Sequence, residues 1–401
     1  MNAQPDFPSV PIGEVSQVNP RGPAKAELSP DDEVDFLPMA DLHEDGSVHV
    51  AERRRYEEVA KGYTAFKKGD VLLAKITPCF ENNKIGLAEV STDWAFGSTE
   101  FHVLRTSEKL DRRYLTHFLR QDFIRGEGEK RMTGSAGQRR VPKTFLEELK
   151  IPLPPLEEQK RIAGILDQAD ALRRIRTRAL DKLNTLGHAI FHEMFGGFPN
   201  GEILRDCPEL GEFLLDVKNG LTRRAKGSEE QNDIVLRLKD IRELEVDFSA
   251  VARISLDAKE KQKFSIEKGD LLFVRVNGNA DYVGRNAVFH QFDEPVYFND
   301  HIMRVRVTEE RLIPHFLSFL LNSRFGKAQI AQNRKTSAGQ HTINQDGLSK
   351  IRLPVPSLEQ QREFVDALER IDSWRGRANA SLSVSSDLFA SLQNRAFRGE
   401  L

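Results

Sequence analysis

The chain has 401 residues, which is enough for about two domains of ordinary size. Hydrophobic residues make up 39% and charged residues 30%, and no apolar run approaches the roughly 20 residues that would cross a bilayer, so membrane insertion is not expected. The net charge of -2 argues against a protein that coats nucleic acid regardless of sequence, because such binding needs a basic surplus.

The cysteines and the N-terminal residues indicate the compartment. Cys79 and Cys207 lie far apart, with no metal-ligand spacing, so neither a disulfide framework nor a zinc site is predicted. The first ten residues lack the basic and apolar stretches of a secretory signal. We therefore expect a reducing, cytoplasmic environment and no membrane contact.

The positive charges gather in short clusters. These are Arg53 to Arg55, Arg112 and Arg113, Lys130 and Arg131, Arg139 and Arg140, Arg223 and Arg224, and Arg334 and Lys335. Such clusters are typical of local DNA-binding patches, but solvated faces give the same pattern, and the clusters alone leave both interpretations open.

The first part of the chain has the pattern of a mixed sheet. Short apolar runs alternate with Gly, Pro, Asn and Asp, and "GDVLLAKI" (Gly69 to Ile76) predicts a strand entered through a Gly-Asp turn. A short helix is predicted over Arg112 to Phe123, which makes this module α+β. The loop "SAGQRRV" and the proline-punctuated "IPLPP" come next.

From Leu156 the composition changes to that of a long helix. Apolar residues recur in steps of three and four from Ile162 to Met194, which predicts one helical stripe over about 39 residues. "FGGFPNG" then ends the helix and links it to the second half of the chain.

The second half of the chain repeats this order. "SAGQHTINQDGLSKIRLPVPSLEQQ" (Ser337 to Gln361) aligns without a gap to Ser135 to Gln159, with 10 identities in 25 positions. "EKGDLLFVRV" corresponds to "KKGDVLLAKI", and a helix over Leu312 to Phe325 corresponds to the first short helix. A second long helix begins at a predicted capping box of Ser357 and Gln360.

Two helices of about 58 Å, each with one apolar stripe, are not stable alone in water. The simplest partner for each is the other copy, in antiparallel orientation. We predict an α+β fold in which two similar globular domains are joined by two long antiparallel helices, with a pseudo-two-fold internal repeat. The expected divisions are 1–155, 156–196, 197–356 and 357–401.

The order of globule, long helix, globule and long helix resembles the DNA specificity subunit of type I restriction-modification systems. The motifs are "IPLPPLEEQKRI" and "RLPVPSLEQQREF" at the helix starts, "SAGQRRV" and "SAGQHTI" before them, and the strand in "KGDLLFVRVNG". The match covers nearly the whole chain. It departs from the family pattern at "RGRANASLSVSSD" (375–387), which is rich in small residues.

The resemblance implies a non-catalytic subunit that binds double-stranded DNA. Each globule would be a target recognition domain reading one half of a bipartite, asymmetric sequence. The helices would fix the unread gap and dock two methyltransferase subunits, which bind S-adenosylmethionine, so no cofactor is expected on this chain. A translocase-nuclease subunit would cut unmodified DNA.

Candidate DNA contacts are polar and basic residues on loops, because these side chains can donate to base edges or phosphate. Gly137 and Gly339 would let backbone amides approach phosphate. The alternative is that many of these are ordinary turn residues. The candidates are Lys75, Asn82, Asn83, Lys84, Ser135, Gly137, Gln138, Arg139, Arg140, Arg275, Asn277, Asn279, Arg285, Ser337, Gly339, Gln340 and His341.

No catalytic or metal-binding residue is predicted. The sequence has no Asn-Pro-Pro-Tyr-like methyltransferase motif and no phosphate-binding loop, and His188 and His192 lack a third ligand. Two alternatives stay open: a protein-binding scaffold with a coiled stalk, and a self-contained nuclease.

Overall fold

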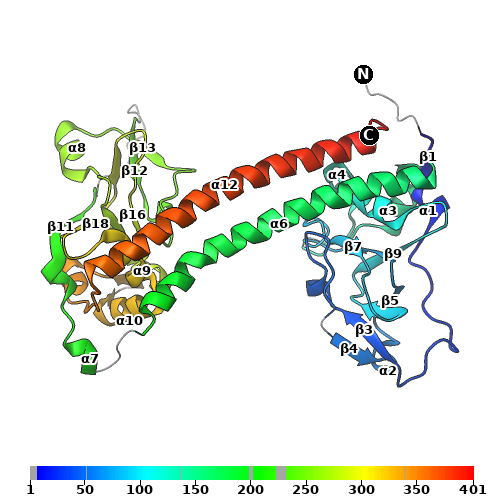
Figure 1. The fold of residues 1–401 in the computed structure, drawn as a ribbon, viewed down its shortest axis with the longest axis horizontal. Helices are drawn as coiled ribbons and strands as arrows, with labels where there is room; N and C mark the ends of the chain where they lie inside the picture. The colour runs from blue at the N-terminus through cyan, green and yellow to red at the C-terminus, as the bar shows by residue number, and fades with distance from the viewer. Residues whose placement is uncertain (1–6, 51, 136, 198–201, 223–231, 338) are drawn as a thin grey trace. The chain divides into compact units, whose positions relative to one another are not determined.

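A computed structural model describes residues 7–50, 52–135, 137–197, 202–222, 232–337 and 339–401. The chain divides into two compact units: unit 1 is Met1–Leu180 with Ala378–Leu401, and unit 2 is Asp181–Arg377. Each unit contains a part of both long helices, α6 (Leu156–Phe195) and α12 (Leu358–Ala396), which Figure 1 labels. The predicted four-part division cuts the chain elsewhere and stays a prediction.

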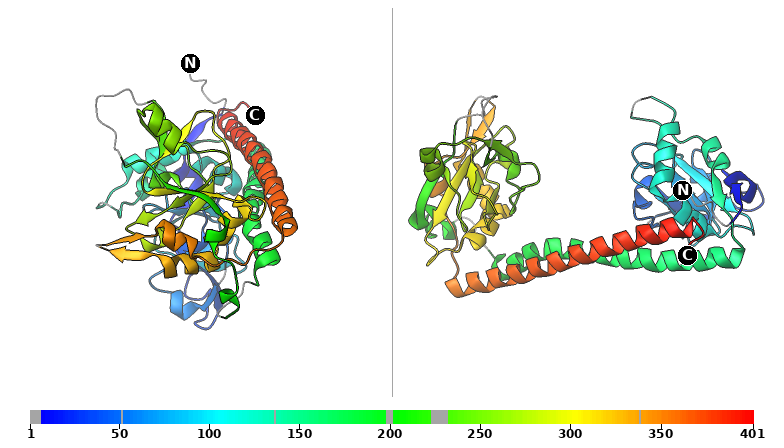
Figure 2. Two further views of the ribbon diagram at one scale, coloured as in Figure 1. Left: turned by 90° about the vertical axis from the view of Figure 1, so that its left-hand side faces the viewer. Right: turned by 90° about the horizontal axis from the view of Figure 1, so that it is seen from above.

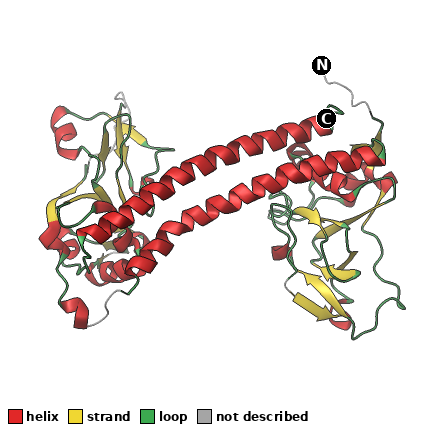
Figure 3. Ribbon diagram, viewed as in Figure 1, coloured by secondary structure: helices red, strands yellow, loops and turns green. Residues whose placement is uncertain are grey.

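The globular part of unit 1 combines short strands with short helices (Figure 3). Its elements are β1 (Ser9–Pro11), α1 (Ile12–Val15), β2 (Ser16–Val18), β3 (Glu33–Leu37), η1 (Met39–Asp41), β4 (Glu52–Arg55), α2 (Tyr56–Val59), β5 (Thr64–Lys67), β6 (Val71–Ala74), β7 (Ile85–Leu87), β8 (Trp94–Gly97), β9 (Phe101–Thr106), α3 (Arg112–Leu119), α4 (Asp122–Arg131), α5 (Lys143–Glu148) and β10 (Lys150–Pro152). The sheet β2-β9-β6-β7 is antiparallel, whereas β4-β3-β8-β5 is mixed because β3 and β8 run parallel.

Unit 2 repeats this plan. Its elements are α7 (Glu202–Arg205), η2 (Leu210–Phe213), β11 (Leu214–Asn219), β12 (Asp233–Leu236), η3 (Leu238–Asp240), β13 (Ala252–Ile254), α8 (Ala258–Phe264), β14 (Leu271–Val274), β15 (Val276–Asn277), η4 (Ala280–Tyr282), β16 (Asn286–Val288), β17 (Val296–Phe298), β18 (Ile302–Val307), α9 (Pro314–Asn322), α10 (Arg324–Asn333), β19 (Lys335–Ser337), β20 (Gln340–Thr342) and α11 (Gln345–Ser349). The sheets β11-β18-β14-β16 and β13-β12-β17 correspond to the two sheets of unit 1, again with one parallel pair.

The Gly-Asp turn before the central strand, β6 in unit 1 and β14 in unit 2, is stabilised in the same way in each unit. Gly69 and Gly269 adopt φ angles of 85° and 92°, which residues with a side chain rarely adopt. The buried carboxylate of Asp70 accepts hydrogen bonds of 3.0 and 2.7 Å from the guanidinium of Arg105. In unit 2, Arg306 binds Asp270 in the same bidentate way.

The short helix predicted in each module is in fact a pair of helices. Residues Arg112 to Phe123 form α3 and begin α4, and Leu312 to Phe325 form α9 and begin α10. The continuation was missed because α4 contains two glycines, Gly126 and Gly128, which lower its intrinsic helix preference.

The long helices pair antiparallel within each unit. In unit 1, Arg161 donates to the backbone oxygen of Leu401, while Arg176, farther along α6, donates to that of Ser381, earlier in α12. The two segments lie side by side in both Figures 1 and 2. In unit 2, the ring of Phe191 lies 5.3 Å from that of Phe364.

Two features of α12 were noted in the sequence, the capping box at its start and the stretch of small residues in its middle. The capping box is confirmed, since the N–H of Ser357 donates to the Gln360 side chain and the N–H of Gln360 donates to the Ser357 hydroxyl. The stretch 375–387, rich in small residues, nevertheless continues the helix without a break. The predicted α+β class, the internal repeat and the two long antiparallel helices are confirmed.

Each unit has a core that joins its sheet to its helix segments. In unit 1, Tyr114 and Phe118 of α3 pack on Phe397, just beyond α12. In unit 2, Phe191, Phe195, Phe316 and Phe364 form an aromatic cluster between α6, α9 and α12. No helix in the described part of the chain has the length and apolar character needed to cross a membrane.

Candidate nucleic-acid interface

The loop that contains Ser135 to Arg140 is a hairpin at the surface of unit 1. Thr133 and Arg140 close it with backbone hydrogen bonds of 3.0 and 2.8 Å. Gly137 has a φ of 83° and open space around the position where a Cβ would lie. Ser135, Gln138 and Arg139 are exposed. The hairpin thus presents these candidate residues to solvent.

The equivalent loop of unit 2 is the β19–β20 hairpin, and its glycine has the same conformation. Gly339 has a φ of 77°, and again its Cβ position has no neighbour within 4 Å apart from the adjoining residues of the chain. Ser337 and Gln340 are exposed and directly opposite each other, while His341 bonds Thr336 at 2.9 Å. The glycine of the SAGQ motif therefore has the same backbone conformation in both units.

In both units this hairpin lies against the end of the central strand. The candidates that follow the strand (75–84 and 275–285) therefore come close to the candidates of the hairpin (135–140 and 337–341). In unit 2, Asn277 of β15 pairs with His341 of β20. In unit 1, Ile76 is bridged to Arg140, and the N–H of Thr77 donates to the backbone oxygen of Arg139 at 3.0 Å. Residues more than 60 positions apart in the sequence thus form one continuous surface in each unit.

Lys75 and Arg275 occupy equivalent positions on this surface. Lys75 Nζ donates to the backbone oxygen of Thr99 at 2.7 Å, and Arg275 Nη1 donates to that of Asp300 at 2.9 Å. Their backbone oxygens also accept equivalent bonds, from the N–H of Val141 at 2.8 Å and of Ile343 at 2.9 Å. One scaffold therefore holds a cation at the same place in both units.

Several other candidates have structural partners. Asn83 adopts a φ of 59°, as turn asparagines do, and Lys84 Nζ donates to the backbone oxygen of Met39 at 3.0 Å. The side chain of Asn277 accepts from the N–H of Asn279, whose own side chain caps η4. These contacts shape the loops, and contact of these residues with DNA stays a prediction.

The two arginines of the first hairpin are bound to carboxylates. Arg140 makes a bidentate pair with Glu100 at 2.9 and 2.7 Å, and Arg139 donates to Glu81 at 3.2 Å. The hydrogen bond from Arg140 lowers the pKa of Glu100, so this carboxylate is ionised at neutral pH. Asn82 donates to a third carboxylate, that of Glu44, at 2.9 Å.

The structure adds Tyr282, which sequence reasoning missed, beside the candidate Arg285. The guanidinium of Arg285 lies 3.7 Å from the ring centre of Tyr282, a tyrosine that is 41% exposed. The sequence feature that could have identified Tyr282 is its position, an aromatic residue within the Gly- and Asn-rich stretch 277–286, since a turn by itself does not require a large ring.

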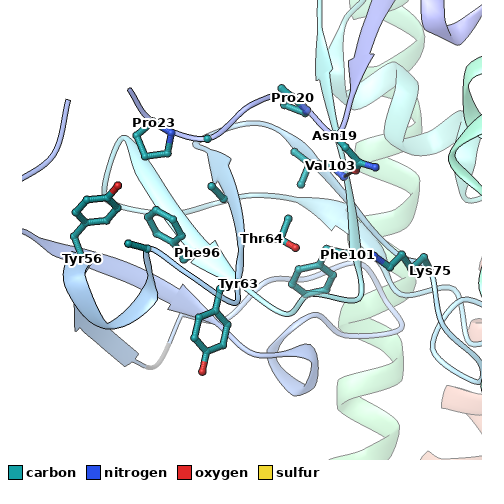
Figure 4. Close-up of a pocket in the computed structure, with 13 residues that line it drawn as sticks. Asn19, Pro20, Pro23, Tyr56, Tyr63, Thr64, Lys75, Phe96, Phe101 and Val103 are labelled. Carbon is teal, nitrogen blue, oxygen red and sulfur yellow. Dashed lines mark hydrogen bonds between the residues drawn. The ribbon is translucent and has the colours of Figure 1, made fainter. Parts of the chain in front are cut away.

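A cavity of about 430 Å³ beside Lys75 was also missed (Figure 4). Tyr56, Tyr63, Phe96 and Phe101 supply aromatic rings to its lining, and Figure 4 shows the hydroxyl of Thr64 among them. Phe96 and Phe101 are buried in the core, whereas Tyr63 is 40% exposed, so Tyr63 is the ring of this lining that offers a face on which a planar base can stack. These residues come from several separate segments of the chain, so no local sequence motif predicts the cavity.

Basic clusters outside the hairpins largely bind acidic neighbours. Arg53 donates to the buried Asp35 at 3.1 Å, and Lys130 to Glu127 at 2.7 Å. Arg334 of unit 2 donates to the backbone oxygen of Ala280 at 2.7 Å, beside the second hairpin. Arg223 and Arg224 lie outside the described residues.

Comparison with known proteins identifies relatives of this repeated architecture. The chain is 29% identical over 313 residues to the StySPI specificity subunit of Salmonella potsdam, a type I restriction enzyme, with 74% of this chain and 67% of the relative covered. It is 44% identical over 177 residues to the EcoAI specificity subunit of Escherichia coli, with 42% of this chain and 29% of the relative covered. The alignment thus spans less than a third of the EcoAI subunit.

Solved structures share the fold. A chain from a type I R-M system superposes with a TM-score of 0.59 at 19% identity, with 99% of both chains covered. The S subunit of a type I restriction-modification system from M. genitalium gives a TM-score of 0.57 at 16% identity, with 99% of this chain and 97% of that chain covered.

The family model described as the type I restriction modification DNA specificity domain matches residues 6–185 and 216–379, one stretch in each half of the repeat. The chain therefore belongs to the family of type I restriction-modification DNA specificity proteins.

Proposed function

We propose that this chain is the DNA specificity subunit of a type I restriction-modification complex, and that units 1 and 2 each read one half of a bipartite target. The observation that supports this most directly is the repeated surface of hairpin and cation. Its backbone geometry is the same in both units, but its side chains differ. Identical scaffolds with different donors are what two unlike half-sites require.

The long helices have a separate role in this proposal. They set the length of the unread gap and dock two methyltransferase subunits, so the chain itself is non-catalytic. Those subunits bind S-adenosylmethionine and methylate adenine, and a translocase-nuclease subunit supplies cleavage. Exposed apolar side chains support docking on unit 1: Leu172 and Ile175 on α6, and Val384 and Leu388 on α12. The proposed location is the cytoplasm, where the DNA is.

Methylome sequencing tests the proposal. The chain is expressed with a type I methyltransferase subunit in a host without such a system, and methylated adenines are mapped with and without the chain. We expect one split motif that appears only with the chain. A matched control replaces Gln138, Arg139, Gln340 and His341 with alanine, which removes side chains and preserves both glycine turns. Methylation independent of the chain, or a continuous motif, would contradict the proposal.

The two alternative functions, a protein-binding scaffold and a self-contained nuclease, predict different experimental results. A scaffold gives no gel shift with pooled random duplexes, either alone or with the methyltransferase. A self-contained nuclease cuts plasmid DNA in magnesium without any partner. We expect a shift in the first experiment and intact plasmid in the second.

A further inference from the structure

The first hairpin differs from the second in the partners of its cations. In unit 1, the side chains of the Arg140–Glu100 pair are 41% and 24% exposed, and those of the Arg139–Glu81 pair 44% and 31%. Both pairs are accessible to solvent, and both stand on the surface that the hairpin presents. Two positive and two negative charges therefore occupy the same surface.

Each of the three guanidinium nitrogens of Arg140 already donates to a protein oxygen. Its Nε and Nη2 groups donate to Glu100, and Nη1 donates to the backbone oxygen of Gln138 at 3.1 Å. One N–H on Nη1 and one on Nη2 are not used in these bonds, but the bonds fix the direction of the guanidinium, which can turn toward a base or a phosphate only if they break. Arg139 is held by a single bond at 3.2 Å, so its guanidinium exchanges partners more easily.

The second hairpin has no such arrangement. Arg275 and Arg334 donate to backbone oxygens, which carry no net charge, and Arg285 lies on the ring of Tyr282. Within the described ranges, no carboxylate makes an ion pair with any of these three arginines. The second surface therefore keeps the positive charges of these three arginines. On the first surface the charges of Arg139 and Arg140 are neutralised, and Lys75, bound to a backbone oxygen, keeps its own.

This difference matters because phosphates dominate the binding of proteins to DNA of unrelated sequence. Each cation that neutralises a phosphate releases counterions, and this effect strengthens binding to every sequence equally. A carboxylate next to the cation removes most of that attraction and repels the phosphate itself. Base contacts must then supply the affinity.

We infer that Glu81 and Glu100 are specificity-determining residues of unit 1, which weaken its binding to unrelated DNA by neutralising Arg139 and Arg140. The inference rests on the proposed function, because it concerns how the first half-site is selected. In this arrangement unit 2 provides most of the sequence-independent attraction, and unit 1 binds firmly only where bases match.

The test uses the reconstituted complex of the full chain with its methyltransferase, and duplexes built from the mapped target. One duplex carries both half-sites, another has the first half-site scrambled, and a third has both scrambled. Glu81→Gln and Glu100→Gln remove each charge and keep the side-chain shape. Glu158→Gln is the matched control, because Glu158 forms a bidentate pair with Arg161 at 2.8 and 2.7 Å and similar exposure, 28% and 48%, at the start of α6.

We expect each variant to bind the fully scrambled duplex roughly three- to tenfold tighter than the unmodified complex. The dependence of log K on log salt should steepen by up to about 0.9 for each additional phosphate that the variant neutralises. Affinity for the intact target should change less, so that discrimination falls. Adding Arg139→Gln to Glu81→Gln should return binding to its original strength, because the freed guanidinium causes the tighter binding.

Two failures are distinguishable. If the unmodified complex binds target and scrambled duplexes equally, the proposed function is wrong. If it discriminates, but the Glu81→Gln and Glu100→Gln variants bind scrambled DNA within twofold of the unmodified complex, or Glu158→Gln tightens binding as much, the inference is overturned. Should Glu100→Gln lower the thermal midpoint, the more exposed Glu81–Arg139 pair decides the question.

Discussion

The side-chain oxygen of Gln159 accepts a hydrogen bond of 2.8 Å from the backbone N–H of Asp111, the residue that caps α3. The same amide donates to the backbone oxygens of Lys109 and Pro154, both at 2.9 Å. In unit 2, Gln361 makes the equivalent bonds to Ile313, Arg311 and Pro356. Each glutamine is completely buried and ties the start of a long helix to its globule.

Gln159→Leu should therefore destabilise unit 1. The substitution leaves three backbone groups without their partner, and each unsatisfied buried group costs about 1–3 kcal/mol, so a loss on the order of 3 kcal/mol is expected. Urea denaturation measures the loss, and hydrogen exchange at the Asp111 amide locates it. Lys160→Ala, at the exposed neighbouring position, should change stability by less than about 0.5 kcal/mol. Equal effects from the two variants would show that the amide network is unimportant.

Lys75→Ala and Arg275→Ala should each alter one half-site only. A good contact to a base edge contributes about 1–3 kcal/mol of discrimination, so preference at the affected position should fall roughly 5- to 150-fold. Motif mapping of the methylated host DNA for each variant provides the measurement. Lys68→Ala, an exposed lysine near the same strand, is the control. A change in both half-sites from either variant would refute the assignment of one half-site to each unit.

Unit 2 should lose stability as the pH falls from about 6.5 to 4. Burial lowers the pKa of His315 to about 4, and the ring of His290 at 5.0 Å adds repulsion, against the attraction of Asp372. In the unfolded chain a histidine has a pKa of about 6.5, so within this window the unfolded state binds more protons. Stability therefore decreases as the solution is acidified.

His315→Gln should flatten this dependence by about 1–3 kcal/mol between pH 7 and 4, as measured by denaturation of the full chain at a series of pH values. His192→Gln makes the same substitution at an exposed position of unit 2 and should leave the slope unchanged. A His315→Gln protein with the original slope would assign the pH dependence to other groups.

Lengthening both long helices should widen the unread gap without changing either half-site. Seven residues complete nearly two helical turns, so inserting seven after Arg178 and seven after Ala378 preserves the apolar stripes and adds about 10 Å, or about three base-pair steps. Methylome mapping would show the wider gap. Unchanged spacing would mean that the helices do not set the gap. Altered half-sites would contradict the assignment of base reading to the globular units and of gap length to the helices.

Local signals in the sequence predicted the repeat, the long helices, the strand after each Gly-Asp turn and the capping box at Ser357. These features depend on residues that are close in the chain. The pairing of Arg140 with Glu100, and the stacking of Arg285 on Tyr282 near the second hairpin, depend on how distant or irregular segments fold, and no periodicity encodes them. In unit 1 the second short helix, α4, was missed because tertiary packing stabilises it despite its two glycines.

Unit 1 is completed by Phe397, whose ring packs against Tyr114, whereas unit 2 is built from the uninterrupted stretch 181–377. During synthesis on the ribosome, the segment that closes the first unit emerges only after all of the second has been made. Until that segment emerges, the first globule has an uncovered apolar surface on α3. Premature termination within α12 would therefore damage the part of the protein that was translated earliest.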